Sequence, residues 1–299
     1  MNVREPDWAY VARSLVKVVA VAAALFLALS VVERVLWFFG GFDDERTALV
    51  YGTAARAVNP DKRLTDDHSD GGLLVTTYTL RGEPRRAGPG EDRTGYEITE
   101  DLFGSVRAPS LGGPSGSLAD ALTSLDVELG VDRQLMEKAR KTIDGLPPTL
   151  EAVAVVEFTH PMAVERFVAF NRRHELCGGE DVSYIYAPYL YDDSSDMFPM
   201  NAVVWNRDMT KKRWEDLTYR CGTEPEAALA EFRRWVGLLY EGDDLEEFGL
   251  SRGRLAGTAE EGVVYGLVVD GWKLADLRKL LDDPEVRTVN LADVAFDLG

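Results

Sequence analysis

Apolar residues gather in one long run near the N-terminus and in shorter blocks along the rest of the chain. Residues 18–32, VVAVAAALFLALSVV, carry no charge, but fifteen helical residues span only about 22 Å, less than the ~30 Å hydrocarbon core of a bilayer. Extension to residues 15–39 gives 25 residues, with Lys17 near one headgroup region and Glu33 and Arg34 near the other. The pattern predicts a transmembrane helix over residues 15–39.

Two other interpretations of this apolar run stay open. A cleaved signal peptide would place small residues such as Ala28 and Ser30 at the cleavage site, and a buried core helix would be equally apolar. A mature N-terminus rarely begins with apolar sequence such as ERVLWFFGG, which therefore favours a retained anchor. Trp37, Phe38 and Phe39 would then form an aromatic belt at the membrane interface.

Charged residues on either side of the run predict its orientation. Arg4, Arg13 and Lys17 precede the apolar core, whereas three of the five residues in 42–46 are acidic. Positive flanks stay on the cytoplasmic side of a membrane. We therefore expect a cell-membrane protein with residues 1–14 in the cytoplasm and an extracytoplasmic C-terminal domain.

The segment after the membrane run mixes turn-forming and strand-forming residues. The patterns predict a helical or extended neck over 42–58, turns over 59–72, a strand over 73–82 and a short strand over 96–99. Residues 107–117, RAPSLGGPSGS, have the composition of a linker. The chain is therefore expected to divide into a membrane-proximal, β-containing segment with its linker, 40–117, and a C-terminal domain, 118–299.

The C-terminal domain alternates helix-period and strand-period patterns. A helical stretch ends at Gly145, and a later amphipathic helix presents Leu229, Phe232, Val236 and Leu239 on one face. Two strand–helix–strand units are predicted, over 150–187 and 262–297, and together they indicate an α+β fold, a ferredoxin-like sandwich with helices over a mixed sheet.

Within these two units, single residues carry further predictions. In the first unit the helix is expected to begin near Pro161, with Ala163, Phe167 and Phe170 on one face. In the second unit Gly266 is expected to allow close approach of a neighbouring backbone. The helix of the second unit is expected to face the core with three leucines, Leu274, Leu277 and Leu281.

Composition and charge describe a folded, acidic protein. The 299 residues are 45% hydrophobic and 28% charged, which is typical of a globular chain. Residues 1–39 hold four basic and three acidic side chains, a net charge of +1. Because the whole chain has a net charge of −18, residues 40–299 have a net charge of −19. Such an acidic body is not expected to bind nucleic acid.

Motifs that would indicate chemistry are not found in the sequence. The three histidines, His68, His160 and His174, do not form a zinc-binding pattern. The sequence GPSGS at 113–117 lacks the final glycine of a nucleophile elbow, and no phosphate-binding loop is present. The sequence therefore predicts no catalytic, cofactor-binding or metal-binding residue, and we do not expect an enzyme.

Two acidic clusters and a group of aromatic residues keep one alternative open. The clusters at 191–199 and 241–248 could bind calcium but lack the spacing of the twelve-residue loop, so solvated loops are the simpler interpretation. The aromatic residues could line a sugar or peptide groove, although packing explains such a pattern more often; they are Tyr184, Tyr186, Tyr189, Tyr191, Trp205 and Trp214. The alternative function is a membrane-anchored envelope hydrolase acting on glycans or peptides.

Cys177 and Cys221 are the two cysteines of the chain. Outside the cytoplasm they could form a disulfide that closes a loop of about 45 residues and contributes about 3–4 kcal/mol. Both lie in turn-like sequence, where the backbone can adjust to disulfide geometry. The alternative is a pair of buried free thiols.

The C-terminal unit resembles a known family. VVYGLVVDG, a leucine-rich helix and PEVRTVNLADV look like the end of the sigma factor regulator C-terminal domain of anti-sigma-like bacterial membrane proteins, and LEAVAVVEF resembles its start, so the likeness covers residues 145–299. The resemblance implies a regulatory protein with one membrane helix and a protein partner in the membrane or envelope. With about fourteen residues before the span, the chain lacks room for a cytoplasmic sigma-binding module.

Overall fold

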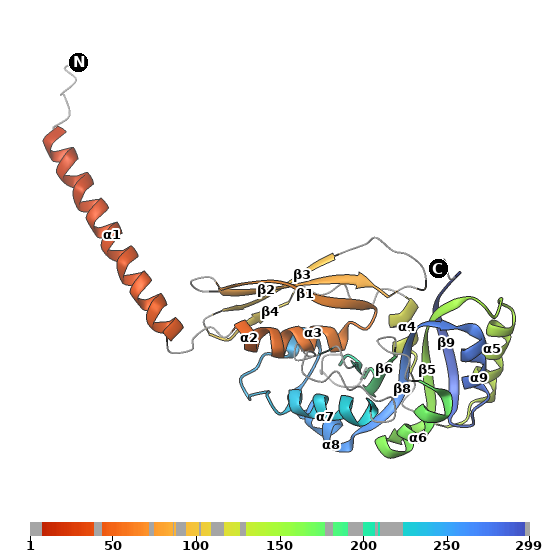
Figure 1. Ribbon diagram of the computed structural model, residues 1–299. Coiled ribbons are helices and arrows are strands. Elements are labelled where there is room, and N and C mark those ends of the chain that lie inside the picture. Colours follow the sequence, from red (N-terminus) through yellow and green to blue (C-terminus); the bar gives the residue numbers. More distant parts are fainter. Residues whose placement is uncertain are drawn as a thin grey trace.

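The computed structural model consists of one isolated N-terminal helix and a compact body that contains two β-sheets (Figure 1). Its description covers residues 8–38, 44–71, 75–85, 87, 94–101, 103–108, 117–125, 130–176, 182–190, 200–206, 209 and 224–296. The predicted linker centre, both cysteines and the acidic cluster at 191–199 lie outside the described residues.

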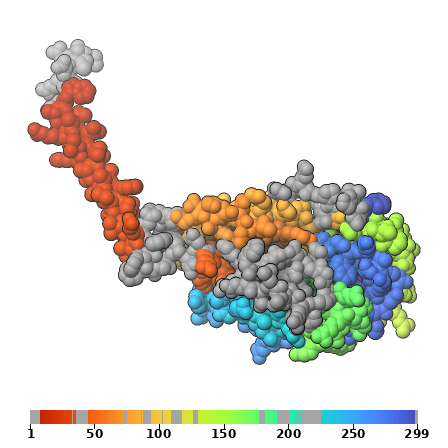
Figure 2. All heavy atoms as spheres, viewed as in Figure 1, coloured from red at the N-terminus to blue at the C-terminus, as the bar shows by residue number. Residues whose placement is uncertain are grey.

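Helix α1, Trp8–Phe38, contains the predicted apolar run. Its segment Trp8–Val32 is long and apolar enough to cross a membrane, and none of it is buried against the rest of the protein. Figures 1 and 2 show α1 standing clear of the body. By length and composition α1 fits a membrane anchor and a signal sequence equally well. The predicted aromatic belt at 37–39 lies outside the described side chains.

The first part of the body is a four-stranded antiparallel sheet packed on short helices. Its elements are α2 (Asp44–Thr47), the π-helical turn η1 (Ala48–Gly52), α3 (Thr53–Val58), β1 (Lys62–Gly71), β2 (Val75–Pro84), β3 (Thr94–Asp101) and β4 (Val106–Arg107). The strands follow the order β1-β2-β3-β4. The predicted strands over 73–82 and 96–99 correspond to β2 and β3.

Two predictions for this part were wrong. Residues 59–72, expected to form turns, instead supply β1, an edge strand in which only Leu64 is buried. Because β1 is held by backbone pairing to β2 rather than by an apolar face, its polar sequence gave no strand signal. Residues 44–58 are helical, as predicted, but they do not form a neck, since their helices place Val50 and Ala54 in the core.

The second part of the body contains the two predicted strand–helix–strand units. Its elements are α4 (Ser117–Thr123), α5 (Arg133–Asp144), β5 (Glu151–Ala163), α6 (Val164–His174), β6 (Val182–Ala187), β7 (Val203–Trp205), α7 (Glu224–Val236), the 3-10 turn η4 (Glu246–Phe248), α8 (Arg252–Glu261), β8 (Val263–Lys273), α9 (Leu274–Leu281) and β9 (Val286–Ala295). The units β5–α6–β6 and β8–α9–β9 confirm the α+β prediction. Helix α5 ends at Gly145 as expected, after an N-terminal cap by Asp132.

The second sheet has the strand order β7-β6-β8-β5-β9, and its described pairs are all antiparallel. The predicted mixed sheet was therefore wrong. Each strand–helix–strand unit returns its second strand parallel to its first, but a strand of the other unit, β8 or β5, lies between them. The interleaving converts two parallel crossovers into antiparallel neighbours.

Gly266 of β8 lies opposite Glu157 of β5 at the point where the pairing becomes irregular. A Cβ atom at Gly266 would lie less than 3.0 Å from the Val156 carbonyl oxygen, a separation that real Cβ atoms essentially never show. The predicted close approach of a neighbouring backbone is confirmed.

The two faces of this sheet are covered by different helices. One face packs Ala152, Ala154 and Val156 against α6, α7 and α9, and the other packs Val153 and Val155 against α4. The predicted core positions on α7 and α9 are buried. The first apolar cluster also includes residues of the β1–β4 sheet, so the segments before and after the predicted linker share one core.

The start of α6 differs from the prediction. Pro161 lies in β5, and α6 begins at Val164 after Ala163, which is exposed. The strand continues past the proline because β5 pairs with β8 again at Met162, beyond a register shift. Phe167 and Phe170 are fully buried as expected.

Candidate functional site

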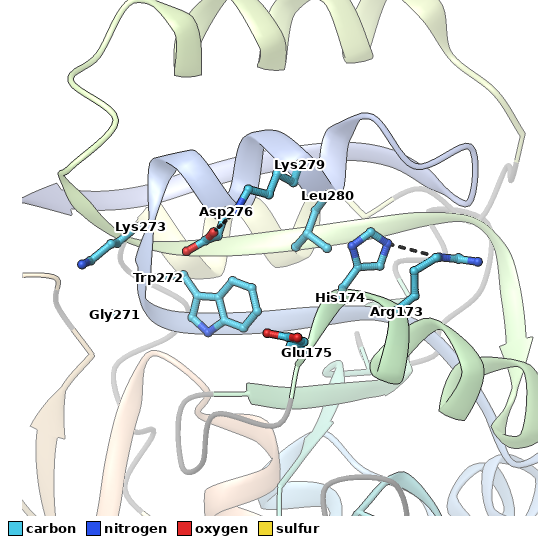
Figure 3. Close-up of a pocket in the computed structure, with 9 residues that line it drawn as sticks. All are labelled: Arg173, His174, Glu175, Gly271, Trp272, Lys273, Asp276, Lys279 and Leu280. Carbon is cyan, nitrogen blue, oxygen red and sulfur yellow. Dashed lines mark hydrogen bonds and ion pairs between the residues drawn. The ribbon is translucent and has the colours of Figure 1, made fainter.

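A hollow of about 520 Å³ opens where the end of α6 meets the junction of β8 and α9 (Figure 3). Three of its residues come from the end of α6 and the others from the second strand–helix–strand unit; they are Arg173, His174, Glu175, Gly271, Trp272, Lys273, Asp276, Lys279 and Leu280. The hollow is therefore built where the two units meet.

The backbone on both sides of the hollow is shaped by left-handed residues. Helix α6 ends at Glu175, whose φ is 52°, and Gly271 near the end of β8 has a φ of 68°. Glycine adopts this conformation without cost, whereas Glu175 pays a modest steric cost. Glu175 ends the helix, whereas Gly271 lies at a register shift of β8, after which Trp272 and Lys273 pair with β5 again.

The first amides of α9 are not free to bind a ligand. The Leu274 amide donates to the Leu150 carbonyl oxygen over 2.9 Å, and the Ala275 amide donates to the Pro148 carbonyl oxygen over 3.1 Å. These two amides are therefore unavailable to a ligand in the hollow. Figure 3 shows Trp272 at its centre, with Lys273 and Lys279 at its edge.

The charged side chains along α9 differ in their availability. Lys279 is held by Asp276, with 2.8 Å between Nζ and Oδ1, and the hydrogen bond to this carboxylate raises the pKa of Lys279. Lys273 is exposed and makes no ion pair within the described part of the chain. One of the two ammonium groups is therefore available to an anionic group.

The α6 side of the hollow is a fixed ionic cluster. The His174 Nε2 atom lies 2.7 Å from Asp283 Oδ2, and Arg173 contacts both Asp283 and Glu285 over 2.9 Å. Burial acts to raise the pKa of Asp283. The hydrogen bonds from the Glu285 amide and His174, with the charge of Arg173, outweigh burial and hold that pKa below its usual value. His174 also packs on the Phe170 ring, with 4.6 Å between the ring centroids.

The hollow combines cationic and aromatic side chains. The ammonium groups of Lys273 and Lys279 lie at the rim, and the partly buried ring of Trp272 lies at the centre. This combination fits a partner that carries both an acidic and an apolar group. Glu175 and Asp276 are the carboxylates that line the hollow. Among the described residues, no group of three or more His, Cys, Asp or Glu could hold a metal ion.

The histidines singled out in the sequence lie apart. His68 is exposed on β1 and His160 is exposed on β5, whereas His174 lines the hollow. Cys177 and Cys221 lie outside the described residues, so their disulfide stays a prediction, and so does any role of residues 113–117 and 191–199.

The acidic cluster at 241–248 includes a structural carboxylate. Asp243 accepts a hydrogen bond from Arg46 over 2.7 Å and another from the Tyr240 amide over 2.7 Å. Because these partners tie the segment after α7 to α2, the role of Asp243 here is in packing the body together.

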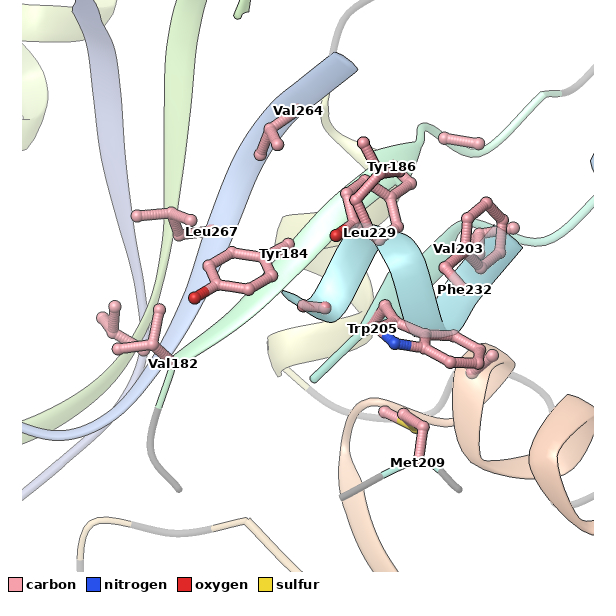
Figure 4. Close-up of a cluster of buried hydrophobic side chains, with 14 of the residues drawn as sticks. Val182, Tyr184, Tyr186, Val203, Trp205, Met209, Leu229, Phe232, Val264 and Leu267 are labelled. Carbon is pink, nitrogen blue, oxygen red and sulfur yellow. The ribbon is translucent and has the colours of Figure 1, made fainter. Parts of the chain in front are cut away.

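Three described members of the aromatic group are core residues, whereas Tyr189, which follows β6, is partly exposed. Tyr184, Tyr186 and Trp205 are each no more than 1% exposed and pack against Phe232 and its neighbours (Figure 4). The centroids of the Trp205 and Phe232 rings lie 5.1 Å apart in an edge-to-face contact. Packing therefore explains these residues, while Tyr191 and Trp214 lie outside the described part of the chain.

Sequence reasoning missed the hollow itself. Its two walls are separated by almost one hundred residues, from Glu175 to Gly271, and none of the lining residues forms a motif. The available signals were local: a basic run at the end of one predicted helix, at 172–174, and a Trp-Lys pair immediately before another.

No protein-family model, curated protein or solved structure matches the chain. The resemblance of residues 145–299 to the sigma factor regulator C-terminal domain therefore stays a prediction, and function has to be argued from the geometry of the chain itself.

Proposed function

We propose that the chain is a single-pass cell-membrane protein whose extracytoplasmic α+β body binds a protein or envelope ligand and acts in regulation. The observation that carries this proposal is the contrast between α1, unburied along its apolar segment Trp8–Val32, and a body that has its own core. An apolar surface of that length is costly in water and is satisfied by a bilayer. Positive charges before the apolar run support a cytoplasmic N-terminus.

We further propose that the second sheet is a ferredoxin-like sandwich. The order β9-β5-β8-β6 interleaves two strand–helix–strand units, and the apolar cluster on one face of this sheet includes side chains of α6 and α9. Strand β7 and helices α7 and α8 would then be an insertion between β6 and β8. This interpretation supports binding because the hollow forms between the ends of the two units.

The hollow is the proposed ligand site. Lys273 would meet an acidic group of the partner, with the Lys279–Asp276 pair beside it, and Trp272 would contact an adjacent apolar group. The regulatory part of the proposal rests on the resemblance of residues 145–299 to sigma factor regulators.

The test of binding is affinity purification of the tagged full-length protein from detergent, after cross-linking in cells. The double variant Lys273→Glu with Lys279→Glu reverses the charge of the rim. The control, Lys138→Glu with Lys141→Glu, makes the same charge change at exposed positions of α5. A partner recovered with the wild type and the control but lost with the rim variant supports the site. Equal recovery with the rim variant would place binding elsewhere, and recovery of no specific partner would refute the proposal.

The test of topology is proteolysis of intact cells. Protease added outside should digest the chain beyond about residue 42, and mass analysis of the protected fragment should recover residues 1 to about 42, which include α1. Protection of the body would reverse the proposed orientation. A mature protein that begins after α1 would identify a cleaved signal sequence instead of an anchor.

A further inference from the structure

The end of the body that holds α2 exposes two large aromatic side chains. Among the described residues of the body, seven large hydrophobic side chains are exposed: Val75, Phe103, Val131, Leu190, Leu238, Tyr240 and Phe296. Single exposed apolar residues are ordinary, but two of these seven, Phe103 and Tyr240, lie in segments that contact α2. Phe103 is 95% exposed and Tyr240 is 66% exposed.

Phe103 is presented outward by a tight turn between β3 and β4. The Asp101 carboxylate accepts hydrogen bonds from the Phe103 amide over 2.9 Å and from the Ser105 amide over 3.0 Å. Gly104 follows with a φ of 77°, a conformation that glycine adopts freely. The turn is therefore held by its own hydrogen bonds, and the phenyl ring at its tip lies in solvent.

Tyr240 is likewise held in place while its ring is exposed. Its amide donates to Asp243 over 2.7 Å, and the Arg46 guanidinium carbon lies 4.6 Å from the centre of its ring. Asp243 also accepts a hydrogen bond from Arg46, so α2 and the segment after α7 are fastened together.

Both aromatic residues lie in segments that contact the end of α2. Tyr240 contacts Arg46, and Thr47 donates a hydrogen bond over 2.6 Å to Glu100, which is three residues before Phe103. In Figure 1, β4 and the segment that follows α7 lie at the same end of the body as α2, the end from which the chain passes to α1.

The length of chain between α1 and α2 limits how far this end can be from a membrane. Helix α1 ends at Phe38 and α2 begins at Asp44, six residues later. Even fully extended, six residues reach about 21 Å. If α1 crosses a bilayer up to its last turn, the start of α2 stays within about 21 Å of the membrane surface, so the segments that contact α2 can reach the headgroup region.

We propose that Phe103 and Tyr240 form a membrane contact that seats the body on the headgroup layer of the bilayer. Aromatic rings with one apolar side and one wet edge are favoured at this depth. The nearby carboxylates of Glu100, Asp101 and Asp243 are engaged in the hydrogen bonds described above. The contact is therefore aromatic rather than electrostatic, and it forms on lipid without net charge. This inference rests on the proposed role of α1 as an anchor.

The test is photo-crosslinking of the full-length protein in phosphatidylcholine nanodiscs. The photoreactive analogue p-benzoylphenylalanine is introduced singly at Phe103, Tyr240, Phe296 or Phe26. Phe296, 67% exposed at the C-terminal end of the body, is a matched control, and Phe26 on α1, 72% exposed, reports the anchor itself. Intact-protein mass then detects a covalent phospholipid.

We expect a phospholipid adduct at Phe103, Tyr240 and Phe26, and none at Phe296. An adduct at Phe26 without one at Phe103 or Tyr240 would overturn the proposed contact while leaving the anchor intact. An equal adduct at Phe296 would also overturn it, because the body would then touch lipid without a preferred face. Absence of the adduct at Phe26 would instead refute the anchor and the contact that depends on it.

Discussion

The strand pairing at Gly266 makes a sharp prediction about stability. Substitution of Gly266 by alanine places a methyl group against the Val156 carbonyl oxygen, closer than 3.0 Å, and also beside the Ile185 side chain. The nearest atom belongs to the backbone of β5, and β8 is paired on both sides, to β5 and to β6. The paired backbones of β5 and β6 cannot move aside as the end of a flexible side chain could.

The expected cost follows from this geometry. Overpacking a well-packed core costs about 1–3 kcal/mol. For a folded unit of this size, about 2–4 °C of Tm is lost per kcal/mol, so the Tm of Gly266→Ala should fall by roughly 2–12 °C. The substitution removes no charge and no hydrogen-bonding side chain, so the effect reports the close approach of the two strands.

Gly257 provides a matched control. It lies inside α8, and a Cβ atom added there meets no other atom within 4 Å. Alanine is favoured over glycine in a helix by about 0.5–1 kcal/mol, so the same substitution at Gly257 should raise the Tm by roughly 1–4 °C.

The assay is thermal unfolding of the full-length variants in mild detergent, followed by near-ultraviolet circular dichroism and checked by urea titration. Opposite shifts for Gly266→Ala and Gly257→Ala are expected. A Gly266→Ala variant as stable as the wild type would refute the reasoning, because the two strands would then have room for a methyl group.

Three further predictions concern the charged and sulfur-containing side chains. Glu157→Leu should destabilise the protein by about 3–5 kcal/mol in urea titration, because it leaves the buried Arg287 without its carboxylate partner at 2.6 Å, and adding Arg287→Met should recover most of the loss. Folding lowers the pKa of Asp283, so its ionised carboxylate stabilises the folded protein at pH values above the unfolded pKa of 3.8. This stabilisation is lost as the pH falls through the folded pKa, so Asp283→Asn should flatten the acid limb of a stability–pH curve. Cys177 and Cys221 should be bridged, so the denatured, unreduced protein should resist alkylation, and labelling of both would exclude the disulfide.

Local patterns in the sequence predicted the elements whose burial depends on one repeating face. The strand–helix–strand units and the leucines of α9 are visible in neighbouring residues, because the periods of helix and strand bring those residues to one side. The run of α1 is visible for a different reason, since it is uncharged on every side over residues 18–32. Gly266 was also predictable, since a glycine within an apolar strand marks a place that a side chain cannot occupy. Failure occurred where the local signal was weak, as at the polar edge strand β1.

Contacts between distant residues decided the remaining features. The sheet is antiparallel because β8 lies between β5 and β6, and no residue near any of these strands specifies that neighbour. The hollow appears only when the end of α6 meets the β8–α9 junction, almost one hundred residues away. Likewise, Phe103 and Tyr240 come to one end of the body through Thr47 and Arg46. Strand order and these juxtapositions are set by the total free energy of long-range packing, which is shared among many residues and is not encoded in any short segment.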